Sequence, residues 1–373
     1  MKVIGLIFSN IHDSSIPEMT ARRTMASVPF GGRYRLIDFA LSGMVNAGIT
    51  KVGIVTHNNY RSLLSHIGTG KDWDLARRGG GAILLPPFVT TFENPRAGKL
   101  YSTRLEALIG VTEFLSDEMA DAVVLSDCDG VCNVDLTAVL REHAEDGADL
   151  TVITKRMRAG RDADLVCADE DGNVTEFVTA ARTPREAQDV NTNILVFSRT
   201  FLLTVIENAA IHGDTDFYRQ ALPRCMEGAR VRLWQHTGYF ARVNGVAEYF
   251  CASMDLLQQS VREELLCVPD RPILTKVYNS PPTTYGANAV VNNALIADGC
   301  HIEGRVENAI LFRGVHVRRD AVVRDSILFS RTDAGEGVSL SCVIADKNVT
   351  VRDARVLSGH AALPFYIAKG KSI

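Results

Sequence analysis

The sequence lacks an excess of basic residues and any long apolar run. Its 373 residues include 40 Lys and Arg against 44 Asp and Glu, a net charge of −4. This balance argues against nucleic-acid binding, because a phosphate backbone requires a basic face. No apolar run reaches the roughly 18 residues that span a membrane, and residues 1–8 are too short for the apolar core of a signal peptide. We therefore expect a cytoplasmic protein that binds neither nucleic acid nor membrane and is long enough for two domains.

Repeated pairs of cysteines are also absent. The eight cysteines show no repeated CxxC spacing, which favours reduced and mostly buried thiols in a chain of this size. Cys128 and Cys132 could supply half of a metal site. Because no second pair accompanies them, buried residues at a strand end are the favoured interpretation.

Glycine is missing where a nucleotide-binding protein usually has most of it. Residues 2–8 (KVIGLIF) predict a strand, and residues 5–19 (GLIFSNIHDSSIPEM) contain no glycine after Gly5. A phosphate loop needs glycine because its backbone N–H groups can approach phosphate closely only where no Cβ intervenes. The segment is therefore either a dismantled phosphate site or was never one.

The first two thirds of the chain alternate strand and helix patterns. Apolar, β-branched runs at 2–8, 51–57, 122–127, 150–154 and 193–198 predict strands, and helical periodicity covers 37–45, 103–115 and 246–259. This alternation favours an α/β domain with a mostly parallel sheet. Ligands of such sheets bind at the carboxyl ends of the strands. The chemistry is therefore expected around residues 9–13, His57 and residues 127–130.

The last third has a different period. A segment with four prolines (267–282) precedes aliphatic residues at six-residue steps, such as Val290, Ile296 and Ile302. Alternating surface strands would show a period of two, whereas six-residue steps with three steps per coil are typical of a parallel β-helix. We expect an α/β domain over 1–260, a linker over 261–287 and a β-helix over 288–373.

Residues 28–49 (VPFGGRYRLIDFALSGMVNAGI) closely resemble a segment of ADP-glucose pyrophosphorylases, also called glucose-1-phosphate adenylyltransferases, which make the glucosyl donor for glycogen and starch. The resemblance extends to residues 122–127 (AVVLSD), 176–177 (EF), 238–240 (GYF) and 343–351 (VIADKNVTV). It implies a nucleotidyltransferase Rossmann-like mixed sheet followed by a left-handed β-helix. It also implies a Mg²⁺-assisted attack of glucose 1-phosphate on the α-phosphorus of ATP, which depends on positioning and charge neutralisation.

This resemblance also shows that the positions which should carry the chemistry are altered. The residues found where the family has its glycine loop, two lysines and a magnesium-binding aspartate are Ser9, Asn10, His12, Ser14, Met25, Ala180 and Arg242. A unit charge about 4 Å from a divalent ion is worth about 8 kcal/mol at an effective dielectric of 20, so an arginine in place of that aspartate repels the ion. Arg104 and Leu105, within residues 102–107 (STRLEA), would crowd the base or ribose pocket.

Some family positions keep suitable side chains. Asp127 or Asp129 could fill the remaining metal-binding position, although acidic turn residues are common at strand ends. Glu176 and Asn193 are candidates for the sugar pocket. The residues that match the family's effector-sensing segment are Arg22, Arg23, Arg33 and Arg35. They could bind a sugar-phosphate or nucleotide regulator, or they could equally be solvated surface arginines.

The altered pattern resembles the D-type subunit of bacterial ADP-glucose pyrophosphorylase. It favours a non-catalytic or weakly catalytic regulatory subunit that needs no cofactor of its own and joins a catalytic paralogue in a hetero-oligomer, with a tetramer expected. The first alternative is an active nucleotidyltransferase that uses Asp129 and a substitute cation such as Lys155. The second is a hexapeptide-repeat acyltransferase with a histidine base, for which His301, His316 and His360 are available. It leaves the first two thirds of the chain unexplained.

Overall fold

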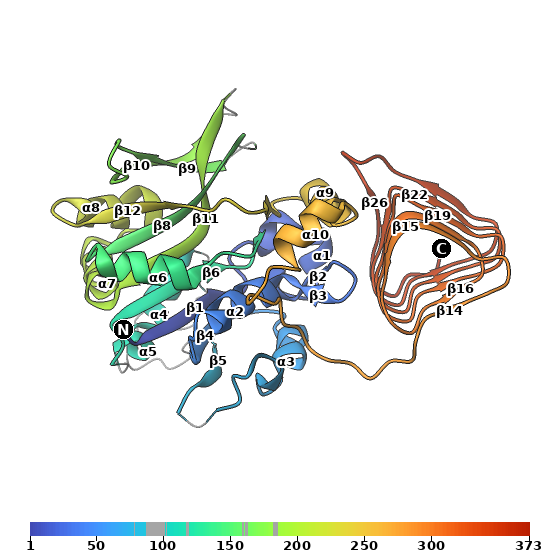
Figure 1. Cartoon of the computed structure of the whole chain (residues 1–373), viewed down its shortest axis with the longest axis horizontal. Coiled ribbons are helices and arrows are strands. Elements are labelled where there is room, and N and C mark those ends of the chain that lie inside the picture. The colour runs from blue at the N-terminus through green and yellow to red at the C-terminus, as the bar shows by residue number, and fades with distance from the viewer. Residues whose placement is uncertain are drawn as a thin grey trace.

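The computed structural model has two bodies, a mixed sheet covered by helices and a triangular stack of coils (Figure 1). The structure describes residues 1–77, 79–86, 101, 103–116, 119–158, 160, 163–181 and 186–373. Within these ranges, no helix combines the length and the apolar character needed to cross a bilayer.

Nine strands form the sheet of the first body, in the order β10-β9-β11-β6-β1-β4-β5, with β8 beside β11 and β12 beside β8. They are β1 (Val3–Phe8), β4 (Lys51–Val55), β5 (Gly81–Leu85), β6 (Ala122–Asp127), β8 (Leu150–Arg158), β9 (Ala163–Ala168), β10 (Val174–Ala181), β11 (Ala187–Ser198) and β12 (Val231–Gln235). Strand β1 runs parallel to β4 and β6. Strand β11 runs antiparallel to β6 and β8. The mixed sheet is thus confirmed, and the expectation of a mostly parallel one is wrong because β11 reverses direction at the centre of the sheet.

Two short pairs complete the strands of this body, β2 (Pro29–Phe30) with β3 (Tyr34–Arg35) and β7 (Gly130–Cys132) with β13 (Phe240–Arg242). The helices are α1 (Pro17–Thr20), α2 (Leu36–Asn46), α3 (Arg61–Ile67), α4 (Arg104–Gly110), α5 (Thr112–Ser116), α6 (Leu136–Glu145), α7 (Arg199–His212), α8 (Leu222–Met226), α9 (Val246–Asp255) and α10 (Gln259–Leu265). Short 3-10 turns lie at Asp13–Ser15, Met25–Ser27 and Lys71–Trp73, and a π-helical turn at Phe217–Ala221. The predicted helix over 103–115 is interrupted at Val111, directly after Gly110, which is a poor helix former.

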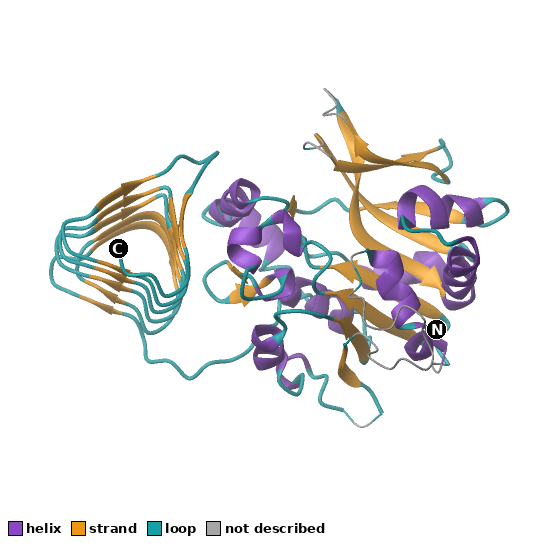
Figure 2. Cartoon of the chain, turned by 180° about the vertical axis from the view of Figure 1, so that it is seen from behind, coloured by secondary structure: helices purple, strands orange, loops and turns teal. Residues whose placement is uncertain are grey.

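Helices cover both faces of the sheet (Figure 2). Helices α4, α5 and α7 pack on one face, and α2, α3 and α6 pack on the other. In helix α2 the apolar residues Ile37, Leu41 and Met44 are spaced three or four residues apart, so they lie on one face of the helix. All three are fully buried against the sheet. At its start the Asp38 carboxylate accepts the backbone N–H of Arg35 at 3.0 Å. This arrangement places the carboxyl ends of β1 and β6 beside the loops that carry the candidate site.

The second body is a parallel β-helix. Its strands are β14 (Thr284–Tyr285), β15 (Val290–Ile296), β16 (His301–Ile302), β17 (Arg305–Leu311), β18 (His316–Val317), β19 (Val322–Arg324), β20 (Ile327–Leu328), β21 (Asp333–Ala334), β22 (Ser339–Ser341), β23 (Val343–Ala345), β24 (Thr350–Val351), β25 (Val356–Ser358) and β26 (Phe365–Ile367). Successive coils pair in parallel, as β15 does with β17 and β17 with β19. The parallel β-helix predicted from the six-residue steps is thus confirmed, and its coils are consistent with the left-handed form that the resemblance implies. Val290 is an exception, since it faces solvent and its neighbour Val291 aligns with the buried Val306.

The two bodies meet through a third apolar core. Phe30, Tyr249 and Leu256 of the first body pack with Phe312 and Phe329 of the β-helix. Helix α10 ends at Leu265 and the first strand of the coils begins at Thr284, with an extended connection between them (Figure 2). The domain limits 1–260, 261–287 and 288–373 remain a prediction.

A buried ion pair also joins the bodies. The Arg23 guanidinium donates to both carboxylate oxygens of Asp346 at 2.8 and 2.6 Å. Asp346 also accepts from the Tyr366 hydroxyl at 2.7 Å and from the backbone N–H of Lys347 at 2.6 Å. Arg23 is only 4% exposed and Asp346 only 2%. The pair therefore fixes the segment after the first loop to the β-helix.

Candidate functional site

The loop after β1 is held together by side chains. The side-chain oxygen Oδ1 of Asn10 accepts from Ser9 Oγ at 2.8 Å, from Thr56 Oγ1 at 2.9 Å and from the backbone N–H of His57 at 3.1 Å. The backbone N–H groups of Asp13 and Ser15 donate to carbonyls of the same loop. These groups do not form the open cradle of N–H donors that a phosphate loop presents.

Asp13 stabilises the next turn. Its carboxylate accepts the backbone N–H of Met25 at 2.6 Å and the Asn10 side-chain amide at 2.7 Å. Burial raises the pKa of Asp13 to about 6 against the opposing effect of these hydrogen bonds. Met25, at the family's lysine position, is buried in the core between the two bodies, and Ser14 is exposed. The segment therefore has no cation at the family's lysine position and carries the Asp13 carboxylate nearby instead.

Asp127, at the end of β6, contacts two basic side chains, Arg104 and His12. Its Oδ2 lies 2.6 Å from His12 Nε2 and accepts a hydrogen bond from the Arg104 guanidinium. Burial opposes ionisation, but Arg104 and His12 outweigh it and hold the pKa of Asp127 below its ordinary value. Arg104 is 7% exposed at the start of α4 and also donates to the Tyr218 hydroxyl. Arg104, which was predicted to crowd the base or ribose pocket, thus neutralises Asp127, the candidate metal ligand. Leu105, predicted to crowd the same pocket, is instead buried in the core. Residue 102 lies outside the described residues.

Asp129 is paired in the same way. Its Oδ2 accepts from the Asn193 amide at 3.2 Å and lies 3.4 Å from Arg242 Nε. Asn193 has a positive φ of 61° at a register shift between β11 and β8, and this irregularity directs its amide to Asp129. The Arg242 guanidinium also donates to the backbone carbonyl of Asn191. Arg242 therefore stays beside the carboxylate and does not swing away from it.

These side chains do not fit a magnesium ion. His12, Asp127 and Asp129 place one ligand atom each within 4.8 Å of one another, and Oδ1 of each carboxylate has no hydrogen-bond partner among the described residues. Mg²⁺, however, requires a near-octahedral set of oxygen ligands. Burial lowers the pKa of His12, but Asp129 and Asp127 outweigh it and raise that pKa overall. With His12 protonated, three cations face two carboxylates, and this excess of positive charge opposes a divalent ion.

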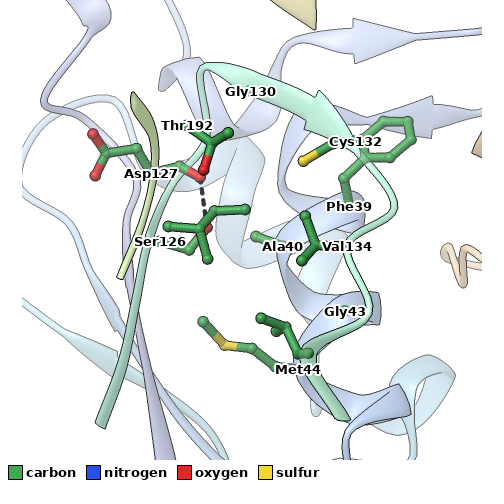
Figure 3. A pocket seen from close by; sticks show the side chains of 12 residues that line it. Phe39, Ala40, Gly43, Met44, Ser126, Asp127, Gly130, Cys132, Val134 and Thr192 are labelled. Atoms are coloured by element: carbon green, nitrogen blue, oxygen red, sulfur yellow. Dashed lines mark hydrogen bonds between the residues drawn. The ribbon is translucent and has the colours of Figure 1, made fainter. Parts of the chain in front are cut away.

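A small cavity lies behind Asp127, between β6 and α2 (Figure 3). Its volume is about 20 Å³, enough for one water molecule and no larger ligand. Apolar side chains such as Met44 and Val134 line it, and the Asp127 carboxylate points away from them. This cavity is therefore not a substrate pocket. It also borders Cys132, whose thiol pKa burial raises to about 12.

The candidate sugar-pocket residues are not together. Asn193 is buried beside Asp129, and its amide oxygen accepts from the Tyr218 hydroxyl at 3.1 Å. Glu176 is exposed on β10, and Ala180 is exposed with φ of 54°. Next to Ala180, the Arg219 guanidinium donates to Thr179 Oγ1. The structure thus brings Asn193 into the paired network and leaves Glu176 outside it.

The four arginines of the effector-sensing segment separate into different environments. Arg22 is exposed, Arg23 is buried against Asp346, and Arg33 and Arg35 line a cleft of about 610 Å³ between the two bodies. The other cations of this cleft are Arg313, Arg331, Lys347 and Lys369. No Asp or Glu is among its described lining residues. Burial, with Arg35 and Arg23 nearby, lowers the pKa of Lys347 to about 7, as expected where positive charges crowd together.

The other predicted groups serve structural roles or face solvent. Lys155 Nζ donates to the backbone carbonyls of Thr237 and Gly238, both at 2.6 Å. His301, His316 and His360 are exposed on the β-helix. All eight cysteines are free, but only three are buried, so the expectation of mostly buried thiols is wrong. Cys167 on β9, Cys251 on α9 and Cys267 just after α10 are exposed to solvent.

Sequence reasoning missed two parts of the site. It identified Arg104 as an obstacle but not as the partner of Asp127, and it did not single out Tyr218. Residues 216–223 (DFYRQALP) place Tyr218 in a π-helical turn, a feature frequent at functional sites. The β-helix cations of the cleft were also missed, because only the folded chain brings them next to Arg33 and Arg35.

Replacing His12 with Gln should give a pH-dependent loss of stability. The raised pKa of His12 means that its ion pair with Asp127 stabilises the fold fully below pH 6.5 and loses that contribution as pH rises through the folded pKa. Urea unfolding of both proteins, from below pH 6.5 to above the folded pKa, measures the difference between their free energies of unfolding. This difference in unfolding free energy should become smaller as the pH rises, and a difference that stays constant would show that folding leaves the pKa of His12 unchanged.

Comparisons with known proteins agree with this architecture. A family model described as nucleotidyl transferase matches residues 16–240, and a GlmU-like C-terminal hexapeptide model matches residues 281–360. The chain is 32% identical over 371 residues to the glycogen biosynthesis protein GlgD of Bacillus subtilis (strain 168), covering 99% of this chain and 96% of that protein. It is 35% identical over 328 residues to GlgD of Geobacillus stearothermophilus, covering 86% of this chain and 83% of that protein.

A glucose-1-phosphate adenylyltransferase from Fervidobacterium nodosum is 28% identical over 376 residues, covering 98% of this chain and 88% of that protein. Both kinds of relative thus span the sheet and the β-helix. The chain therefore belongs to the nucleotidyl transferase family, in the group that contains the GlgD glycogen biosynthesis proteins and the glucose-1-phosphate adenylyltransferases.

Proposed function

We propose that this chain is a non-catalytic or barely catalytic regulatory subunit that modulates a catalytic glucose-1-phosphate adenylyltransferase in glycogen biosynthesis. The observation that carries the proposal is the pairing of Asp127 with Arg104 and His12. Adenylyl transfer must neutralise the charge that develops on the departing pyrophosphate. Here Asp127 and Asp129, the carboxylates that would bind the neutralising metal ion, are already paired with Arg104 and Arg242. They are therefore not available as ligands for that ion.

The proposal includes a partner and a ligand. The partner is a catalytic paralogue in a cytoplasmic hetero-oligomer, with a tetramer expected, and this assignment is supported by the relatives named GlgD and glucose-1-phosphate adenylyltransferase. The ligand is a sugar phosphate or nucleotide bound in the cleft between the bodies. Six basic side chains and no described carboxylate line that cleft, which favours a multiply charged anion.

The cleft is also connected to the altered loop. Lys347 lines the cleft and is adjacent to Asp346, whose carboxylate holds Arg23. Two residues further along the chain, the backbone N–H of Met25 binds Asp13 in the loop after β1. A ligand that shifts Lys347 would therefore act on this loop through one buried ion pair.

Kinetics of the purified chain and of a catalytic paralogue test the proposal. Alone, with ATP, glucose 1-phosphate and Mg²⁺, this chain should turn over at less than about one thousandth of the paralogue's rate, a loss of about 4 kcal/mol in transition-state stabilisation. Mixed with the paralogue, it should change the paralogue's kcat/KM or its response to a phosphorylated effector several-fold. Turnover close to that of the paralogue would favour the alternative of an active adenylyltransferase.

A variant of this chain provides the matched control. Arg331→Glu reverses one charge in the cleft without touching Asp127 or Asp129. We expect it to assemble with the paralogue as the unaltered chain does and to lose most of the effector response. If the effector response of Arg331→Glu were unchanged, the cleft would not be the effector site. The regulatory role would then be tested only by mixing this chain with the paralogue.

A further inference from the structure

One outer face of the β-helix carries a column of aligned polar side chains. Strands β14, β16, β18, β21 and β24 form this face, and each pairs in parallel with the next. The first residues of these strands face outward and are, in order, Thr284, His301, His316, Asp333 and Thr350. Neighbouring strands lie about 4.8 Å apart, so the side chains of this column are stacked above one another.

Two histidines are neighbours in the column. The ring centroids of His301 and His316 are 6.1 Å apart, and the ring planes meet at 65°. Two imidazoles bound to one tetrahedral ion, with metal–nitrogen bonds of about 2 Å, have centroids about 5 Å apart. Because both side chains are exposed on the surface, a small rotation brings them to that spacing. The two coils therefore present two nitrogen donors to one ion.

A carboxylate lies beside the pair. Glu303 Oε1 is 3.7 Å from His301 Nε2, and the two side chains are 38% and 46% exposed. This distance is longer than a hydrogen bond, but it is close to the roughly 3.3 Å that separates two donors on one tetrahedral ion. Glu303 therefore supplies an oxygen as a third donor, and a fourth position remains for water.

The hydroxyl of Thr284 orients His301. Thr284 Oγ1 lies 2.7 Å from His301 Nδ1. In the tautomer that carries its hydrogen on Nδ1, this N–H donates to the hydroxyl and leaves the lone pair of Nε2 facing Glu303. Histidines that bind a metal commonly donate the hydrogen of their other ring nitrogen in this way. The preceding residue of the column thus prepares His301 as a ligand.

The site ends at His316, because the next residue of the column is already paired. The Arg318 guanidinium donates to both carboxylate oxygens of Asp333, at 2.9 and 2.7 Å. This pair also compensates the charge of Arg318, which lies two residues after His316 on the same face. Two imidazoles and the single carboxylate of Glu303 therefore remain to face a cation.

We propose that His301, His316 and Glu303 form a binding site for a transition-metal ion of the Zn²⁺ class on the outer face of the β-helix. Two imidazole nitrogens and one carboxylate oxygen suit Zn²⁺, whereas Mg²⁺ prefers oxygen ligands. The bound ion links two successive coils, because His316 begins β18 and the other two ligands come from β16 and the residue after it. The site is independent of the regulatory role and of the charge network around Asp127.

Calorimetric titration of the full, EDTA-treated chain with Zn²⁺ in excess Mg²⁺ tests the site. The unaltered chain should bind Zn²⁺, and His301→Gln or His316→Gln should weaken binding at least about 100-fold, because each removes a nitrogen ligand. Thr284→Val should weaken it about 10-fold, because it removes only the group that orients His301. The matched control His360→Gln changes an exposed histidine of the β-helix outside the column and should bind Zn²⁺ like the unaltered chain.

Unfolding in urea provides a second measurement. An ion that binds only the folded chain raises the free energy of unfolding, so Zn²⁺ should raise the urea midpoint of the unaltered chain and leave that of the double variant His301→Gln, His316→Gln unchanged. Absence of Zn²⁺ binding would overturn the proposal. Binding that persists in His301→Gln and His316→Gln would also overturn it, because the ion would then lie at a thiol or at another site. An equal loss in His360→Gln would have the same consequence.

Discussion

Replacing Asp127 with Asn is expected to lower the free energy of unfolding by about 3–5 kcal/mol, the usual cost of removing one partner from a buried ion pair. The Asp127 side chain is 1% exposed and contacts both Arg104 and His12. Asn keeps the shape and one oxygen acceptor but removes the negative charge, so the Arg104 charge is left buried without its counter-ion. Denaturant unfolding of the two proteins at neutral pH measures the difference.

This result distinguishes a structural carboxylate from a metal ligand. In a functioning metal site, two carboxylates held close together repel one another without the ion, so neutralising one of them relieves strain and stabilises the apo-protein. If Asp127→Asn raised the stability of this chain, or if Mg²⁺ raised the stability of the unaltered chain and not of the variant, Asp127 would be a metal ligand. The matched control is Asp129→Asn, which should cost less because Arg242 retains its hydrogen bond to the Asn191 carbonyl.

Replacing Asp346 with Asn should have an effect of similar size, about 3–5 kcal/mol, for the same reason. It leaves the Arg23 guanidinium buried between the two bodies without its carboxylate, although the two side chains are 323 residues apart in sequence. The loss should appear as weaker coupling between the bodies. We expect limited proteolysis within residues 267–283 to become faster, in addition to a lower midpoint in urea.

Two control variants separate charge from packing in this prediction. The double variant Arg23→Met, Asp346→Leu removes both charges and should cost much less than Asp346→Asn, because no unpaired ion is left in the core. Asp333→Asn breaks the more exposed pair with Arg318 on the β-helix and should cost at most about 1 kcal/mol. If Asp346→Asn cost no more than Asp333→Asn, the ion pair would not hold the bodies together.

Much of the fold could be predicted from the sequence because its signals are local. The apolar run of β1, the three-to-four spacing of Ile37, Leu41 and Met44, and the six-residue steps of the last third each encode an element directly. The direction of β11 could not be predicted in this way. An antiparallel return and a parallel crossover use the same strand pattern, and the choice depends on how the intervening segments pack.

The features of the candidate site likewise separate into those visible in the sequence and those that depend on the fold. By itself, the sequence determined that the glycines, lysines and second aspartate of the family's chemistry are absent, because residue types at matched positions are visible without a structure. Only the tertiary structure decided what replaces them. Arg104 lies 23 residues from Asp127 and comes from a different element, and the cations of the cleft come from both bodies. Ion pairs form between groups that folding brings within a few ångströms, and no local pattern in the chain records that distance.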